Sequence, residues 1–339
     1  MPAVASAHTK TVYAGPPPST GKLAGKILGK GGKAFLSRYN PDINDFFRHR
    51  VTVNQGDTVS FVLNGFHTVD LPGKSGNDLP LFVSGKIVTG VLDAAGTPFW
   101  FNGHVPSLGF NPSLSSPTGK RTYDGSSRID SGFPSGSGPP KPLKVTFTKP
   151  GTYKYFCDVH AGMIGYVVVK PKGKPVPSVK QDAAAVTEQL TTDIRSAKAL
   201  AKTKPGPDQV SLGASNSSGV ELFTMFPATL TVKVGTVVKF SMSRSSREVH
   251  TATFGPAKYL AKLANSPAPP ANSLYPSDPV QPIPLDRSSH GNGFANTGAL
   301  DRDSDTPSPG SGTIKFTQAG TYHYICLIHA FMHGTIVVK

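Results

Sequence analysis

The chain has 339 residues, a formal net charge of +15, 36 glycines, 32 prolines and two cysteines. The glycine and proline content favours an all-β architecture with long loops over a helical one, and no run of apolar residues is long enough to predict a membrane helix. The positive charge does not indicate nucleic-acid binding, because the lysines are scattered through glycine-rich loops and no nucleic-acid motif is present.

Local patterns predict the first elements. Residues 10–15 (KTVYAG) predict a short strand, and the glycine- and lysine-rich stretch 21–33 predicts a loop. Residues 49–65 alternate apolar and polar side chains around a Gln55-Gly56-Asp57 turn, which is typical of a hairpin. Residues 229–242 carry the same pattern, so the hairpin is predicted twice.

A helix is predicted over residues 178–204, between the two halves. Ser178 and Gln181 form a capping box, and Pro205 ends the element. One face collects apolar residues at helical spacing: Val186, Leu190, Ile194, Ala197 and Ala201. We expect this face to pack on one or both halves and to make the linker semi-rigid.

The most informative feature is a repeated segment. FTKPGTYKYFCDVHAGMIGYVVVK at residues 147–170 returns as FTQAGTYHYICLIHAFMHGTIVVK at residues 316–339. Both copies contain C-x-x-H-x-x-M, formed by Cys157, His160 and Met163 in the first and by Cys326, His329 and Met332 in the second. The repeat predicts two domains of the same fold, and the short strands between turn signals predict a β-sandwich for each.

A further histidine precedes each motif at the end of a strand-like run, His67 in the first half and His250 in the second. Two imidazoles, one thiolate and one weakly bound thioether are the ligands of an electron-transfer copper site. The cysteine loop fixes three of them locally, whereas the remote histidine requires the folded sandwich. Four ligands repeated together therefore predict two copper ions, one per domain.

The GTYxYxC strand followed by H-x-x-M resembles the plastocyanin/azurin (cupredoxin) family, and the short ligand loop is most similar to that of amicyanin. The resemblance implies two Greek-key β-sandwich domains with type 1 (blue) copper sites. Carried over, the ligands are His67, Cys157, His160 and Met163 in site 1, and His250, Cys326, His329 and Met332 in site 2. The family usually has an asparagine after the remote histidine, where this chain has Thr68 and Thr251.

The predicted domains are residues 8–170 and 208–339, joined by the linker 171–207. The stretches between the remote histidine and the cysteine are longer than in the family and rich in glycine, proline and serine. They could form lids over the copper or decorate the sandwich, and we favour decoration. In the family, electrons leave through the exposed edge of the histidine in the cysteine loop, which implies His160 and His329.

The functions compatible with this pattern are electron transfer, copper sequestration and copper-dependent oxidation. Copper oxidoreductases of related fold place a histidine before the copper cysteine and use H-x-H pairs. Here Phe156 and Ile325 precede the cysteines and no H-x-H occurs. We therefore predict an electron carrier that is not an enzyme.

The remaining histidines are weaker candidates. His333 and His323 are expected on strand faces that point away from copper, and His104 and His290 fall in the loop insertions. His8 would become the mature N-terminus if Ala5-Ser6-Ala7 is the cleavage site of a removed signal peptide. We expect export to the periplasm or the extracellular space.

Charge is unevenly distributed. Residues 1–170 hold 18 basic and 9 acidic residues (+9), 171–207 hold 7 and 3 (+4), and 208–339 hold 10 and 8 (+2). An acidic redox partner protein would be steered toward the first domain, and association with an anionic cell envelope is the alternative explanation of the charge.

Overall fold

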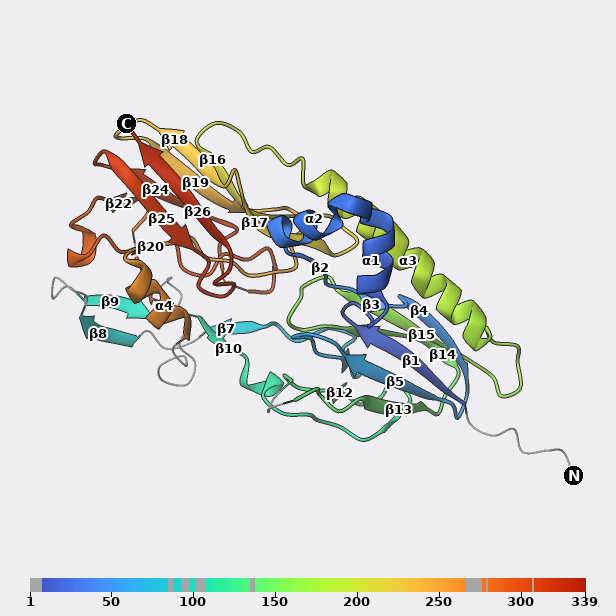
Figure 1. Ribbon diagram of the computed structural model, residues 1–339. Helices are drawn as coiled ribbons and strands as arrows, with labels where there is room; N and C mark the ends of the chain where they lie inside the picture. The colour runs from blue at the N-terminus through green and yellow to red at the C-terminus, as the bar shows by residue number, and fades with distance from the viewer. Residues whose placement is uncertain are drawn as a thin grey trace, which may run out of the picture.

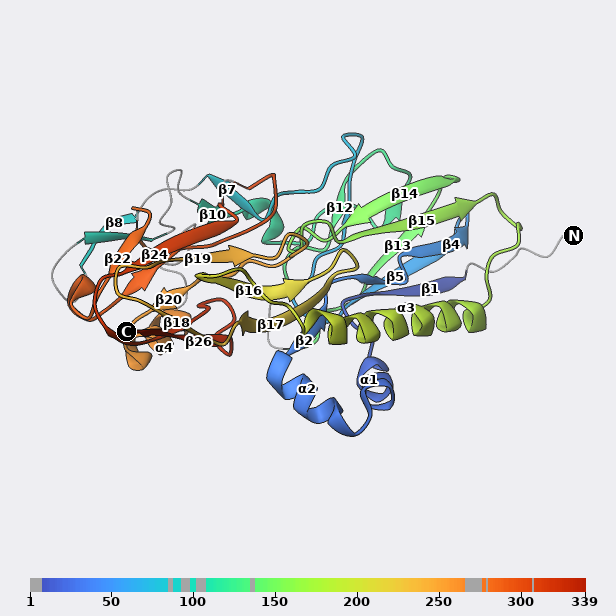
Figure 2. The same ribbon diagram turned by 90° about the horizontal axis from the view of Figure 1, so that it is seen from above.

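The computed structural model describes residues 8–84, 88–92, 98–101, 108–134, 138–265, 276–278, 280–306 and 308–339. Ala5-Ser6-Ala7 and His104 lie outside these residues. The chain forms two β-sandwiches side by side, with a long helix that lies along the first and reaches the second, near β17 (Val220–Phe226), at its C-terminal end (Figures 1 and 2). The predicted fold class, all-β with two Greek-key sandwiches and a linker helix, is confirmed.

The first sandwich consists of two five-stranded sheets. One has the order β11 (Thr122–Tyr123), β13 (Leu143–Phe147), β5 (Thr58–Leu63), β1 (Thr9–Ala14), β3 (Phe46–Phe47), and the other β12 (Ile129–Asp130), β6 (Asp70–Leu71), β14 (Gly151–Phe156), β15 (Ile164–Lys170), β4 (Arg50–Asn54). The strand predicted at residues 10–15 is β1, and the strands predicted before the cysteine and at the end of the repeat are β14 and β15.

The second sandwich repeats this plan. Its sheets have the orders β2 (Pro41–Ile43), β17 (Val220–Phe226), β16 (Gln209–Ser215), β19 (Val237–Met242), β24 (Ser311–Phe316), β22 (Ile283–Leu285), and β18 (Thr229–Val232), β26 (His333–Val338), β25 (Gly320–Ile325), β20 (Thr253–Phe254), β23 (Ala295–Asn296). The pairing sense is also repeated, because β16 runs parallel to β19 as β1 does to β5.

The two predicted hairpins are wrong. β4 and β5 are joined by the tight turn at Gly56, yet β4 pairs with β15 in one sheet and β5 pairs with β1 and β13 in the other. β18 and β19 are separated in the same way. Alternating burial suits either arrangement, since each strand turns one face to the common core. Which strands pair depends on partners that are distant in the sequence, and a local pattern carries no information about them.

An aromatic core fills each sandwich. Tyr155 is fully buried and its ring packs edge-on against Phe46 and Phe61, and Tyr324 occupies the same place in the second sandwich, against Phe240. These tyrosines require a glycine opposite. A Cβ at Gly165 or Gly334 would lie 2.2 Å or 2.3 Å from the tyrosine ring or hydroxyl. The glycine at this position of both repeats therefore leaves room for the buried tyrosine ring.

Strands of the two halves pair with each other in two places. β2, from the N-terminal half, extends the sheet of the second sandwich by pairing with β17. β9 (Pro98–Phe101) pairs with β8 (Val88–Leu92) and with β21 (Pro276–Ser277), which follows α4 (Ala257–Asn265) of the C-terminal half. A further pair, β7 (Phe82–Ser84) and β10 (Leu108–Phe110), lies at the junction. Backbone pairing in two places fixes the relative position of the sandwiches.

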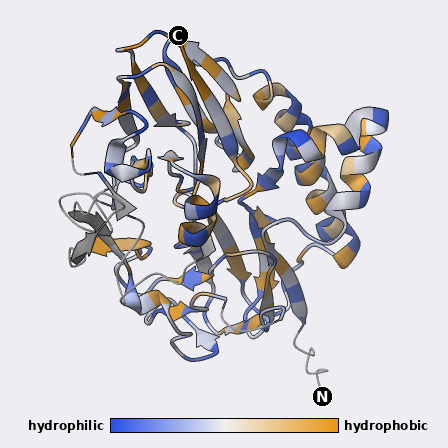
Figure 3. Cartoon of the chain, turned by 60° about the vertical axis from the view of Figure 1, so that its left-hand side comes forward, coloured by the Kyte–Doolittle hydropathy of each residue, from blue (hydrophilic) through white to orange (hydrophobic). Residues whose placement is uncertain are grey.

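The predicted linker helix is confirmed as α3 (Val179–Leu200), and its Ser178–Gln181 capping box is present. Leu190, Ile194 and Ala197 are buried in a cluster that includes residues of both halves, among them Phe47 and Leu222. The alternation of apolar and polar residues along the helices is visible in Figure 3. Among the described residues, no helix combines the length and apolarity needed to span a membrane.

The prediction of a loop at residues 21–33 is wrong. This stretch forms α1 (Thr20–Leu28), a 3₁₀ turn (Gly29–Gly31) and the start of α2 (Gly32–Tyr39). Ala24 and Leu28 pack in the same buried cluster as α3. Packing of this apolar face outweighs the low helix propensity of the glycines.

We expect the buried carboxyl group of Asp193, on α3, to make the free energy of unfolding fall as pH rises. Its side chain is 2% exposed, and Oδ2 accepts no hydrogen bond from any described residue. Burial, with the charge of Asp45, raises its pKa to about 6. The folded state then binds more protons than the unfolded state between about pH 4 and 6, so stability falls as pH rises through this window. Asp193→Asn should remove on the order of 1–3 kcal/mol of this decline. Denaturant unfolding of wild type and Asp193→Asn at pH 4 and pH 7 tests this. An equal change in the free energy of unfolding between the two pH values in both proteins would contradict it.

Candidate metal centres

Site 1 lies at the end of the first sandwich where β14 ends. Cys157 follows β14, His160 lies in the next turn, Met163 precedes β15, and His67 lies between β5 and β6. The Nδ1 atoms of His160 and His67 are 3.4 Å and 3.8 Å from Cys157 Sγ. All four side chains are buried, and Met163 shares a core cluster with Cys157.

Site 2 has the same construction. The Nδ1 atoms of His250 and His329 are 3.7 Å and 3.8 Å from Cys326 Sγ, and 3.1 Å from each other. Met332 is buried in the same cluster as Cys326. The loops close alike, because Cys157 N donates to the Met163 carbonyl and Cys326 N to the Met332 carbonyl, both at 3.0 Å.

These donor sets fit a copper ion. In each site, one thiol sulfur and two imidazole nitrogens lie within 4.8 Å of one another. Atoms that bind one metal at about 2.0–2.3 Å in a trigonal plane lie about 3.5–4 Å apart, which agrees with the sulfur–nitrogen distances above. Soft sulfur with two imidazoles is the donor set of an electron-transfer copper site.

Thr68 and Thr251, which follow the remote histidines, brace the cysteine loops. Thr68 N donates to Cys157 Sγ at 3.3 Å, and Thr68 Oγ1 accepts from Asp158 N at 2.8 Å. In site 2, Thr251 N donates to Cys326 Sγ at 3.4 Å and Thr251 Oγ1 accepts from Leu327 N at 2.9 Å. A hydroxyl therefore ties the strand of the remote histidine to the loop in both sites.

The surroundings of the two cysteines differ in charge. Asp70, Asp130 and Asp158 form a buried cluster beside Cys157. The equivalent positions of site 2, given by strand pairing and by the repeat, are neutral: Thr253, Asn296 and Leu327. Arg128 pairs with Asp70. Burial raises the pKa of Asp70 to about 7 and that of Asp158 to about 10, so the cluster holds protons near neutral pH.

The cysteine pKa values also differ. Burial alone raises the pKa of Cys157, but the charge of His160 and hydrogen bonds from His160 and His67 outweigh it, and the pKa is well below its usual value. For Cys326 burial prevails and the pKa is raised. The thiolate is therefore stabilised more by its own protein surroundings in site 1.

Part of the chain matches a known protein family. Residues 130–170 match the model of the copper-binding proteins of the plastocyanin/azurin family. The predicted resemblance to the cupredoxins is confirmed. No curated protein sequence matches the chain.

Solved cupredoxin structures are similar to part of the chain. Oxidized plastocyanin from Dryopteris crassirhizoma is 22% identical and covers 39% of this chain and 99% of its own, with a TM-score of 0.21. A purple cupredoxin from Nitrosopumilus maritimus is 15% identical over 39% of this chain and 98% of its own, with a TM-score of 0.21. A reduced amicyanin variant is 19% identical and covers 41% of this chain and 89% of its own, with a TM-score of 0.23.

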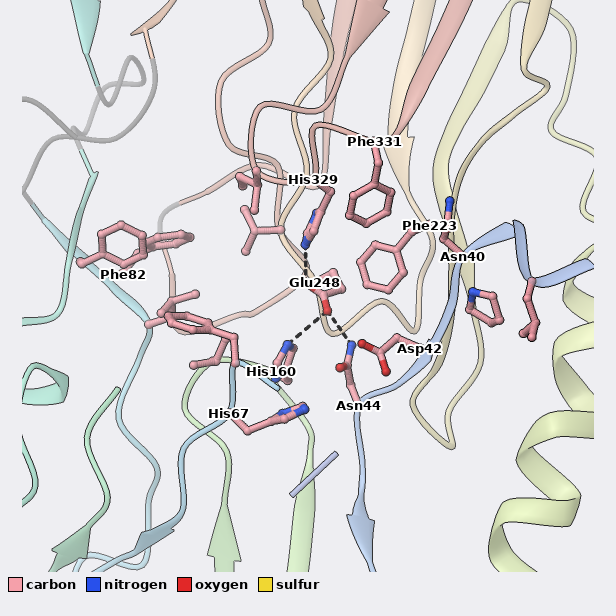
Figure 4. A pocket seen from close by; sticks show the side chains of 18 residues that line it. Asn40, Asp42, Asn44, His67, Phe82, His160, Phe223, Glu248, His329 and Phe331 are labelled. Atoms are coloured by element: carbon pink, nitrogen blue, oxygen red, sulfur yellow. Dashed lines mark hydrogen bonds and ion pairs between the residues drawn. The ribbon is translucent and has the colours of Figure 1, made fainter. Parts of the chain in front are cut away.

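The outer histidines of the two sites, His160 and His329, face each other across the junction between the two halves. Glu248 lies between them, with Oε1 at 3.1 Å from His160 Nε2 and Oε2 at 3.6 Å from His329 Nε2 (Figure 4). Asn44 Nδ2 donates to Glu248 Oε1 at 2.6 Å. Burial raises the pKa of Glu248, but the charges of His160 and His329 and the hydrogen bond to His160 lower it on balance.

The exposed histidine edge that the resemblance implies is absent in site 1. His160 is 5% exposed, because the second sandwich and Glu248 cover its outer edge. The side chain of His329 is 19% exposed. Both rings border a cavity of about 540 Å³ between the halves, whose lining includes the exposed rings of Phe66 and Phe331.

The long loops are more than decoration. Leu81, Phe82 and Leu114 form a buried cluster that includes Val159 and Ile328 of the two ligand loops. Leu79 N also donates to Asp158 Oδ1 at 2.9 Å. The loop of the first half therefore packs over both cysteine loops at the junction.

The histidines that the sequence marks as weaker candidates lie away from both sites where they are described. His323 and His333 are exposed, and His323 Nδ1 is 3.1 Å from Thr335 Oγ1 on the neighbouring strand. His290 Nε2 is 2.5 Å from Asp278 Oδ1. His8 is exposed, and its backbone N donates to Asp57. None of these four lies in either Cys–His–His group.

Proposed function

We propose that the protein is an electron carrier with two type 1 copper sites. The ligands are His67, Cys157, His160 and Met163 in site 1, and His250, Cys326, His329 and Met332 in site 2. The observation that carries this proposal is the duplicated group of one thiol and two imidazole nitrogens, buried and spaced for one ion each. A buried, braced site changes little between Cu(I) and Cu(II), which favours rapid electron transfer.

The same proposal assigns residues 8–170 and 208–339 to one copper domain each, with 171–207 as linker, and excludes catalysis by the copper sites. Phe156 and Ile325 occupy the positions that a bridging histidine has in copper oxidoreductases of related fold. We further propose export from the cytoplasm and an acidic redox protein as partner, because residues 1–170 carry +9 of the net charge.

Metal analysis and a visible spectrum test the function. Copper-reconstituted protein should contain two coppers per chain and show a strong thiolate-to-Cu(II) band that dithionite bleaches and ferricyanide restores. A sequestering protein would instead bind Cu(I) tightly and give no stable blue form with Cu(II). Fewer than two coppers per folded chain would contradict the two-site assignment.

A further inference from the structure

We propose that Glu248 is a bridge between the two copper centres, through which they exchange electrons and influence each other's reduction potential. The proposal rests on the proposed two-site function and adds to it a positioning residue and an internal route. It replaces the expectation that each site exchanges electrons only through its own exposed histidine.

The position of Glu248 is unusual for a carboxylate. It precedes the site 2 ligand His250 by two residues, it is 8% exposed, and it reaches across the junction to His160 of the other half. Among the described ion pairs, it is the one carboxylate that contacts histidines of both sites. Figure 4 shows both rings and Asn44 converging on it.

The chemistry of the rings supports the bridge. Each outer histidine turns Nδ1 to its own cysteine, at 3.4 Å for His160 and 3.8 Å for His329, so Nε2 remains to face Glu248. A metal-bound histidine is commonly oriented by a carboxylate that accepts its second N–H, and such partners tune the metal. Here a single carboxylate performs this task for two sites in different domains.

The route between the sites contains no empty gap. It runs through the His160 ring, the Glu248 carboxylate and the His329 ring, with contacts of 3.1 Å and 3.6 Å. Electron tunnelling weakens steeply across empty space and less across bonded or contacting atoms. The step moves one electron from the reduced site to the oxidised site, so it requires no proton and no additional oxidant or reductant.

The shared carboxylate also couples the potentials. Oxidation of site 1 makes the His160 N–H a stronger donor and draws the Glu248 charge toward it, which leaves His329 less stabilised. Because the group is buried, solvent and salt screen this effect weakly. The potential of each site should therefore depend on the oxidation state of the other.

Rapid photoreduction of the copper-loaded protein tests the route. After a pulse that reduces a fraction of the sites, redistribution of the electron between them is followed by the visible and EPR spectra, with Cys157→Ser and Cys326→Ser variants as single-site references. Glu248→Gln keeps the length of the side chain but loses the charge and one acceptor, and should slow redistribution about 10- to 100-fold. Glu248→Asp keeps the charge, is one methylene too short to contact both rings, and should slow it as well.

Asp193→Asn is the matched control, because it neutralises another buried carboxylate that lies on α3 and contacts neither site. It should redistribute electrons at the wild-type rate. If Glu248→Gln and Glu248→Asp retain two blue coppers and redistribute as fast as wild type, the bridge is refuted while the two-site function stands.

NMR of the metal-free protein separates the bridge from the function. The Nε2 signals of both His160 and His329 should move in Glu248→Gln and stay in place in Asp193→Asn. This result would support the bridge even if wild-type protein failed to hold two blue coppers, an outcome that refutes the function. Movement of one ring alone, or of neither, would overturn the bridge.

Discussion

Cys157→Ser should remove about half of the blue absorption, and Cys326→Ser should remove the other half. The thiolate supplies the charge-transfer band of such a copper site, and each cysteine lies in one group only. Serine preserves the size of the side chain but lacks the polarisable sulfur. Each variant should retain the copper spectrum of the other site and most of its stability.

Visible absorption per chain and copper content, measured on folded protein, check this expectation. Met225→Leu is a suitable control, because Met225 is a buried sulfur residue of the second sandwich that lies outside both motifs. Loss of all colour in either cysteine variant would mean that one site cannot form without the other, and would contradict separate centres.

The grouping of these residues in space was predictable because most of them are local in sequence and the pattern is repeated. Cys157, His160 and Met163 lie within one short loop, and the repeat at Cys326 removes the ambiguity of a single motif. His67 and His250 could be found because each ends an apolar, alternating run. The structure brings each remote histidine to within 4 Å of its cysteine sulfur, as a sandwich requires.

Glu248 and Asn44 could not be found in the same way. Glu248 lies two residues before His250, but the equivalent position before His67 is Gly65, so the repeat gives no signal. Its role depends on how the two sandwiches meet, which is set by α3 and by the pairing of β2 and β9 with strands of the other half. The formation of α1 at a predicted loop, and the absence of the predicted hairpins, likewise depend on packing partners that are distant in the sequence.

The two sites should differ in reduction potential, with site 2 higher. The carboxyl groups of Asp130 and Asp158 beside Cys157 have neutral counterparts in Asn296 and Leu327. The cluster holds protons near neutral pH, so its negative charge grows as pH rises above the pKa of about 7 of Asp70. That charge stabilises the more positive Cu(II) form and lowers the potential of site 1, so the difference should widen with rising pH. At an effective dielectric constant of about 20, a buried unit charge near the ion contributes on the order of 1 kcal/mol or more, so we expect a difference on the order of tens of millivolts.

Reciprocal exchange of one residue tests the cause of the difference. Asp130 Oδ1 accepts from Gly132 N at 2.5 Å, and Asn296 Oδ1 accepts from Gly298 N at 3.0 Å, so the two residues hold equivalent turns. Asp130→Asn should therefore keep the turn and raise the potential of site 1, whereas Asn296→Asp should lower that of site 2.

A spectroelectrochemical titration of wild type and both variants gives the measurement. The two midpoints should approach each other in each single variant and lie closest together when the exchanges are combined. Equal midpoints in wild type, a higher midpoint for site 1, or midpoints unmoved by both exchanges would show that the acidic cluster does not set the order. Asp130 lies on β12 at the edge of its sheet and takes no part in the contacts of Glu248 with His160 and His329, so its effect is separable from that of Glu248. The Asp130 exchange should shift the midpoint of site 1 without slowing electron redistribution, whereas Glu248→Gln should slow it.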